Sequence, residues 1–201
     1  VGDMSHDEAF EAAARAFDET RRRSTHERYD ILMRIRRGME ERRDELSTAE
    51  ALDLIQQMAA LGITEVTLIG GEAFLRPDWL QLIRAITDAG MTATMATGGY
   101  GLNVHTARKM KDAGLAQVSV SVDGLEATHD RLRGRAGSYA RCFEAMAAFT
   151  EVGLPFGINT QINRHSAPEL PQLYERLRDA GARGWQYTLT VPMGNASEWP
   201  E

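Results

Sequence analysis

Helix patterns and strand patterns alternate strictly from residue 46 onward, and this regularity constrains the fold more than any other feature of the chain. Five short runs rich in β-branched and apolar residues recur, each separated from the next by an amphipathic stretch. Strands that alternate with helices pair in parallel through right-handed crossovers. A closed eight-stranded barrel needs about 250 residues, and the chain has 201. We therefore expect an α/β fold, either an incomplete (β/α) barrel or an open sheet.

The element boundaries follow from caps and glycines. The predicted strands cover residues 65–70, 92–96, 117–122, 156–160 and 185–190, and the predicted helices cover residues 47–62, 77–89, 104–113, 138–152 and 168–180. Ser47 and Glu50 form a capping box at the start of the first of these helices. Each helix ends at a glycine, which takes the left-handed conformation that a helix exit often requires.

The first 45 residues follow a different pattern. Residues 7–17 and 24–45 have the spacing of two amphipathic helices, the second opened by Ser24 and Glu27, and no strand is predicted before Leu46. The sequence therefore predicts two parts, a helical segment over residues 1–45 and a partial barrel over residues 46–201.

The composition of the chain disfavours two classes of partner, nucleic acids and membranes. A net charge of −6 and a pI near 5.5 argue against nucleic acid as the main partner. No apolar run approaches the roughly 20 residues that a bilayer crossing needs, and the acidic, alanine-rich start has no signal-peptide core. We interpret the chain as a soluble cytoplasmic protein without a membrane partner.

The chain has one cysteine, Cys142, which excludes a disulfide framework and any multi-cysteine metal site. Cys142 lies on the apolar face of a predicted helix, which favours a packed thiol over a nucleophile. His129 and His165 follow strand ends, where a surface or capping role is more usual than catalysis.

Chemistry in a parallel α/β fold is expected at the carboxyl ends of the strands. Small and polar residues follow every predicted strand; the candidates are Gly70, Gly71, Glu72, Thr97, Ser121, Asp123, Asn159 and Thr160. Each group alone also fits an ordinary turn, but their coincidence at one edge favours a cleft for a neutral or zwitterionic small molecule. No strand end carries a Gly-x-Gly-x-x-Gly or Walker pattern, which disfavours dinucleotide and ATP binding.

The chain resembles the radical S-adenosylmethionine (radical SAM) superfamily, in particular its SPASM-domain peptide maturases. The segments that carry this resemblance are residues 44–50, 66–78, 119–134, 159–163 and 186–194. The resemblance covers about three quarters of the chain. It implies a six-stranded partial barrel that binds SAM and a four-iron four-sulfur cluster and acts on a peptide substrate. The first family strand is missing here, so five strands are expected.

The resemblance also assigns the cofactor-binding residues. The methionine ammonium of SAM would be held by Gly70, Gly71 and Glu72. The ribose would lie near Ser121 and Asp123, and the carboxylate near Arg133. The adenosine would lie beside Asn159 and Thr160, with Thr97 at the same edge of the sheet. No catalytic residue and no metal ligand is assigned.

The sequence departs from the family where the cluster should bind. The family carries Cys-x-x-x-Cys-x-x-Cys just ahead of the helix that begins here at Ser47, and three thiolates hold the cluster. Residues 27–43 contain no cysteine. We therefore expect this chain to be inactive in reductive SAM cleavage. Two alternatives stay open: a non-catalytic module that binds SAM or a peptide, and a recombinant chain without a selected function.

The N-terminal segment has a resemblance of its own. Residues 12–18 and 24–46 are similar to the N-terminal helices of aldehyde dehydrogenases, with an apparent crossover near residues 43–46. A chimeric chain is one reading, and a diverged helical cap on a radical SAM relative is the other. Loss of the first strand leaves the edge at residues 65–70 unpaired, which predicts self-association unless the N-terminal helices cover that edge.

Overall fold

A computed structural model describes Met33 and residues 47–189 of the chain. Apart from Met33, the predicted N-terminal helices and the predicted boundary after residue 45 lie outside these residues and stay predictions.

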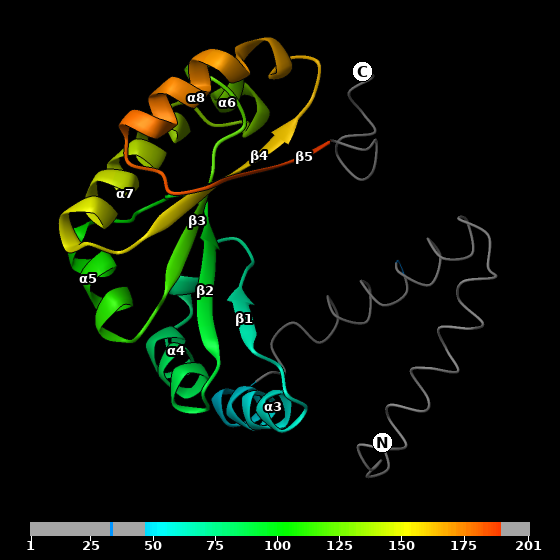
Figure 1. The fold of residues 1–201 in the computed structure, drawn as a ribbon, viewed down its shortest axis with the longest axis vertical. Coiled ribbons are helices and arrows are strands. Elements are labelled where there is room, and N and C mark those ends of the chain that lie inside the picture. The colour runs from blue at the N-terminus through cyan, green and yellow to red at the C-terminus, as the bar shows by residue number, and fades with distance from the viewer. Residues whose placement is uncertain (1–32, 34–46, 190–201) are drawn as a thin grey trace. The chain divides into compact units, whose positions relative to one another are not determined.

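Five strands alternate with helices through the described part of the chain (Figure 1). The strands are β1 (Glu65–Leu68), β2 (Thr92–Thr97), β3 (Gln117–Ser121), β4 (Phe156–Ile162) and β5 (Trp185–Leu189). The helices are α3 (Thr48–Ala60), α4 (Trp79–Asp88), α5 (Val104–Asp112), α6 (Glu126–Leu132), α7 (Ser138–Val152) and α8 (Leu170–Asp179), with short 3-10 turns η1 (Ala73–Leu75) and η2 (Ala167–Glu169).

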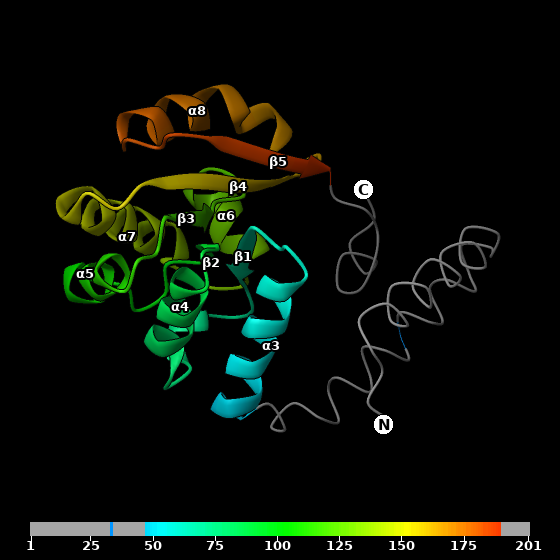
Figure 2. The same ribbon diagram turned by 60° about the horizontal axis from the view of Figure 1, so that its bottom comes forward.

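The strands form one parallel sheet in the order β1-β2-β3-β4-β5. The sheet curls into a half-barrel, with α4, α5, α7 and α8 along its outer face (Figures 1 and 2). Among the described strands, β1 pairs only with β2 and β5 only with β4, so the barrel does not close. The predicted partial barrel is confirmed.

The register separates an apolar outer face from a polar inner face. Leu68, Met95, Val118 and Phe156 form one cross-strand row that packs in the core beneath the helices. Side chains alternate along a strand, so the intervening rows point inward. These inner rows comprise Glu65, Thr67, Thr92, Thr94, Ala96, Gln117, Ser119, Ser121, Gly157, Asn159, Gln161, Gln186 and Thr188, all exposed or half-buried except Gly157.

The glycines at the helix ends behave as predicted. Positive φ angles occur at Gly62, Gly90, Gly114, Gly153 and Gly181, which follow the five predicted helices. At Gly153 the φ is 67°, and the Leu154 N–H donates to the Phe149 carbonyl at 2.9 Å, which closes the end of α7. No helix among residues 47–189 combines the length and hydropathy that a bilayer crossing needs.

Helix α6 was not predicted, because its seven residues are mostly polar and only Thr128 and His129 are buried. Its first turn is held from outside the element: Glu169 accepts hydrogen bonds from the Leu125 N–H and the Thr128 hydroxyl, both at 2.7 Å. Strand β1 also ends two residues earlier than predicted, at Leu68.

Candidate functional site

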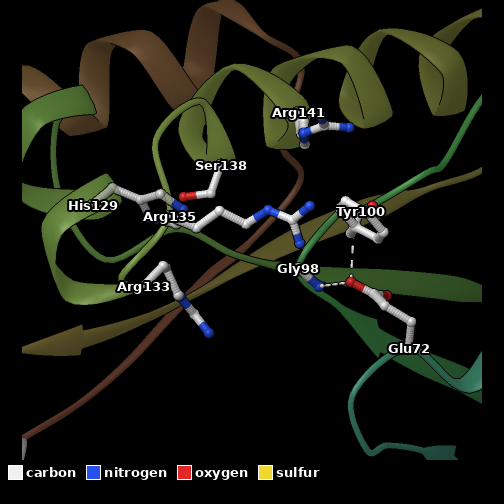
Figure 3. Close-up of a pocket in the computed structure, with 8 residues that line it drawn as sticks. All are labelled: Glu72, Gly98, Tyr100, His129, Arg133, Arg135, Ser138 and Arg141. Carbon is white, nitrogen blue, oxygen red and sulfur yellow. Dashed lines mark hydrogen bonds between the residues drawn. The ribbon is translucent and has the colours of Figure 1, made fainter.

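The loops that follow β1, β2 and β3 meet the start of α7 at one end of the sheet, where they form a pocket of about 180 Å³ (Figure 3). Its lining residues are Glu72, Gly98, Tyr100, His129, Arg133, Arg135, Ser138 and Arg141. The pocket lies at the carboxyl ends of the strands, where ligands of parallel α/β proteins bind.

Glu72 is the acidic group of this pocket, and its carboxylate binds the loop after β2. Oε1 accepts the N–H groups of Gly98 at 3.0 Å and Tyr100 at 3.3 Å, and Oε2 accepts the hydroxyl of Thr97. An ionised carboxylate offers about four acceptor positions. Three are occupied, which leaves room for a further donor such as an ammonium group.

The loop after β2 packs so closely that a side chain at Gly98 or Gly99 would crowd its neighbours. A Cβ on Gly98 would lie 3.2 Å from Glu72 Oε1. A Cβ on Gly99, whose φ is 80°, would lie 3.0 Å from the Arg141 carbonyl oxygen and 3.1 Å from Cys142 Cα. These contacts show that the loop after β2 packs against Glu72 on one side and against α7 on the other.

Asp123 anchors the end of β3. Its Oδ1 accepts the Gln161 N–H at 2.9 Å, and its Oδ2 forms an ion pair with Arg133 at 2.7 Å. The Asp123 side chain is buried, and Arg133 is partly exposed. The structure therefore brings Asp123 and Arg133 together, with the charge of Arg133 already balanced.

His129 lies beside Asp123 and is buried, with 1% of its surface exposed. The expectation of a surface role was wrong, because α6 turns this side chain beneath the pocket. Its Nδ1 accepts the Asp123 N–H at 3.0 Å. Burial, followed by the nearby charge of Arg133, lowers the pKa of His129 from its ordinary value of 6.5.

Cys142 is a packed thiol, as predicted, with none of its surface exposed. Burial is the main cause that raises its pKa to about 12. A thiol with that pKa stays protonated near neutral pH and is a poor nucleophile.

Tyr100 lies between two arginines at the pocket. The Arg135 guanidinium carbon lies 3.9 Å from the ring centroid and that of Arg141 lies 5.0 Å from it. The hydrogen bond from Arg135, together with both guanidinium charges, lowers the pKa of Tyr100. Neither arginine forms an ion pair with a carboxylate within residues 47–189.

Sequence reasoning missed Tyr100, Ser138, Arg135 and Arg141. The first lies three residues beyond β2, and the others lie in the α6–α7 loop and at the start of α7. A search restricted to strand ends does not reach them. The spacing of arginines on both sides of residue 138 was the available signal.

The remaining predicted residues divide between the two faces of the sheet. Ser121 and Asn159 are register partners on the inner face. Thr160 is buried on the outer face, where its hydroxyl donates to the Val122 carbonyl at 2.6 Å and accepts from Trp185 Nε1 at 2.8 Å. Thr97 is also buried and donates to Glu72. Gly70, with a φ of 134°, and Gly71 lead from β1 to Glu72.

The residues present do not fit an iron–sulfur cluster. Such a cluster is held by several cysteine thiolates, and the whole sequence has one cysteine. That cysteine is buried in α7 and its pKa is about 12. Within the described part of the chain, no three His, Cys, Asp or Glu side chains converge on a metal site.

Comparison with known proteins places these features in context. The family model described as "Radical SAM superfamily" matches residues 21–177. This match begins within the N-terminal segment, upstream of residue 44, where the resemblance described above begins.

Among curated relatives, the AdoMet-dependent heme synthase of Methanosarcina barkeri is 34% identical over 78% of this chain and 45% of its own length. The sporulation killing factor maturation protein SkfB of Bacillus subtilis is 28% identical over 77% of this chain and 38% of its own length. The chain thus spans less than half the length of these relatives.

The structure of Streptococcus suis SuiB superposes with a TM-score of 0.65 and 18% identity, over 75% of this chain and 35% of SuiB. SuiB has also been solved bound to S-adenosylmethionine and bound to the precursor peptide SuiA. At this identity the likeness concerns the fold.

Proposed function

The chain belongs to the radical SAM superfamily, and from that premise we propose that these 201 residues bind SAM at the Glu72 pocket without generating a radical by themselves. The observation that carries the second half of the proposal is the single buried cysteine, which cannot replace three thiolates. The residues of this chain supply no reductant for SAM cleavage.

Binding of SAM is supported by the charges around the pocket. The open acceptor position of Glu72 suits the methionine ammonium, since hydrogen bonds between ionised groups are about twice as strong as neutral ones. The carboxylate of SAM suits the three arginines of the pocket. Arg133 is paired with Asp123, whereas Arg135 and Arg141 have no carboxylate partner among the described residues. The ribose and adenosine would then extend over Ser121, Asp123 and Asn159, with Thr160 supporting β4 from behind.

For the second ligand we propose a peptide. Parallel sheets are usually buried on both faces, yet the inner face here presents hydroxyl and amide side chains from all five strands and no large apolar one. Thr67 and Thr94 already bond to each other there at 2.8 Å. Such a face suits the donors and acceptors of an extended peptide better than the apolar surface of a tetrapyrrole. The relatives include both peptide-modifying and heme-forming proteins.

Calorimetric titration with SAM tests the first proposal. We expect saturable binding by the wild type and a loss of roughly tenfold or more in affinity for Glu72→Ala, because a charge-assisted hydrogen bond is removed. Glu65→Ala is the matched control, since Glu65 lies at the opposite end of β1 and accepts only from Thr94 among the bonds described. We expect this control to bind like the wild type.

Circular dichroism of both variants would verify that the fold is kept. Equal affinity of the wild type and Glu72→Ala would remove Glu72 from the site. Absence of any saturable binding by the wild type would instead favour the alternative of a recombinant chain without a selected function.

A further inference from the structure

His129 is held in one tautomer by its neighbours. The Asp123 N–H points at Nδ1 at 3.0 Å, and a backbone N–H can only donate. Nδ1 therefore carries no proton, and the neutral ring has its proton on Nε2. Nε2 lies 3.8 Å from the sulfur of Cys142, a weak acceptor.

Cys142 in turn contacts the ends of two strands, β2 and β3. Its Sγ lies 3.3 Å from the carbonyl oxygen of Gly98 and 3.5 Å from that of Ser121. Because the thiol stays protonated, it can donate to one of these oxygens. A hydrogen-bonded series thus runs from Asp123 through His129 and Cys142 to Gly98, the glycine whose N–H binds Glu72.

We propose that His129 is a positioning residue for the SAM site: as the neutral Nε2–H tautomer it ties the Asp123 end of β3 to the loop after β2, which binds Glu72, and its protonation releases that tie. Protonated Nδ1 would be a second donor facing the Asp123 N–H, and the contact would become repulsive. This inference rests on the proposed binding of SAM.

The groups around His129 decide the sign of the pH effect. Asp123 faces it from the end of β3, Asp130 and Arg133 belong to α6 and its C-cap, and Tyr139 and Cys142 face it from α7, with the Tyr139 ring centroid at 6.0 Å. The two aspartates favour the imidazolium, but burial and Arg133 prevail and lower the pKa below 6.5. The SAM affinity should therefore fall as the pH decreases through this lowered pKa of His129, with the neutral imidazole dominant at neutral pH and above.

The closing experiment compares His129→Asn with His129→Gln. The Asn amide oxygen occupies nearly the place of Nδ1 and accepts the Asp123 N–H without titrating, whereas the Gln amide reaches toward the place of Nε2. SAM affinity is measured by calorimetry between pH 5 and 8, with His105→Asn, an exposed histidine on α5, as the matched control. A ¹⁵N NMR spectrum of the imidazole nitrogens reports the tautomer without any ligand.

We expect the wild type and His105→Asn to lose affinity together as the pH falls through the lowered pKa of His129. His129→Asn keeps an acceptor for the Asp123 N–H but loses the contact with Cys142, so its SAM affinity should be several-fold lower at neutral pH and should not fall further at lower pH; His129→Gln should be roughly tenfold weaker throughout. Identical pH profiles for the wild type and His129→Asn would overturn the inference, as would a spectrum with the proton on Nδ1. Absence of SAM binding by the wild type at every pH would overturn the proposed function, while the NMR spectrum would still decide the tautomer.

Discussion

Gly124 shows, at the scale of single residues, how tightly the loops above the sheet are packed. It lies between Asp123 and Leu125, whose N–H binds Glu169. A Cβ added to Gly124 would lie 2.8 Å from Glu169 Oε2 and 2.8 Å from Thr128 Cγ2. Contacts this short would force Glu169 and Thr128 to move. The hydrogen bonds of these two side chains hold the first turn of α6.

We therefore predict that Gly124→Ala lowers the free energy of unfolding by about 1–3 kcal/mol, the usual cost of overpacking a filled site. Urea denaturation measures the change. Gly184→Ala is the control, since a Cβ there meets nothing within 4 Å. Equal stability of the two variants would mean that the Glu169 contact yields without cost.

The residues of the site differ in how far the sequence reveals them. Asp123 directly follows a predicted strand, and Glu72 follows one after two glycines, so their place at the strand ends could be predicted. The partners of Asp123 could not: His129 and Arg133 lie on a helix without an apolar repeat, and their approach depends on tertiary contacts. The contact of Cys142 with Gly98 joins residues 44 positions apart, which no local pattern encodes.

Asp130 organises the start of α7, at the scale of secondary-structure elements. Its carboxylate accepts the Gly137 N–H at 2.5 Å, the Ser138 hydroxyl at 2.9 Å and the Tyr139 N–H at 2.8 Å. The bond from Tyr139 is the main cause that lowers the pKa of Asp130 from 3.8. One side chain of α6 thereby caps the next helix.

Asp130→Ala should destabilise the protein by about 1 kcal/mol, as loss of a helix cap does. Because the pKa is lower in the folded state, the contribution of Asp130 is fully present above pH 3.8 and is lost as the pH falls through the folded-state pKa. Thermal unfolding at pH 7 and near pH 3 measures both effects, with Glu144→Ala, at an exposed position of α7, as control. An equal effect of Asp130→Ala at the two pH values would contradict the role of the charged form.

Elements with a regular apolar spacing could be predicted almost to the residue. Helix α7 spans Ser138–Val152 as expected, because a filled apolar face and the glycine that follows it define both ends. Helix α6 and turns η1 and η2 could not be predicted. They are short, and contacts such as those of Glu169 stabilise them rather than a repeat of their own.

At the scale of the whole molecule, the described part of the chain is an open half-barrel whose sheet has two edges, β1 and β5. Strands β1 and β5 each have one described partner, and exposed apolar side chains lie beside them, with Ile69 72% and Leu189 78% exposed. Unpaired edges with apolar side chains are templates for association with another chain.

We predict that the chain self-associates through the β1 edge. Ile69→Lys should weaken the affinity of this association at least roughly threefold, because a lysine beside an edge strand opposes edge-to-edge pairing. Sedimentation velocity over a range of concentrations measures it. Leu54→Lys on α3, where the leucine is 45% exposed, is the control and should associate like the wild type. A monomeric wild type at all concentrations would contradict the prediction.

The most direct test of the account is anaerobic reconstitution of the chain with iron and sulfide, followed by iron analysis, visible absorbance and measurement of 5'-deoxyadenosine after addition of SAM and a reductant. We predict far less than one cluster per chain and no SAM-derived deoxyadenosine, while SAM still binds. Four irons per chain with SAM-dependent deoxyadenosine release would contradict it.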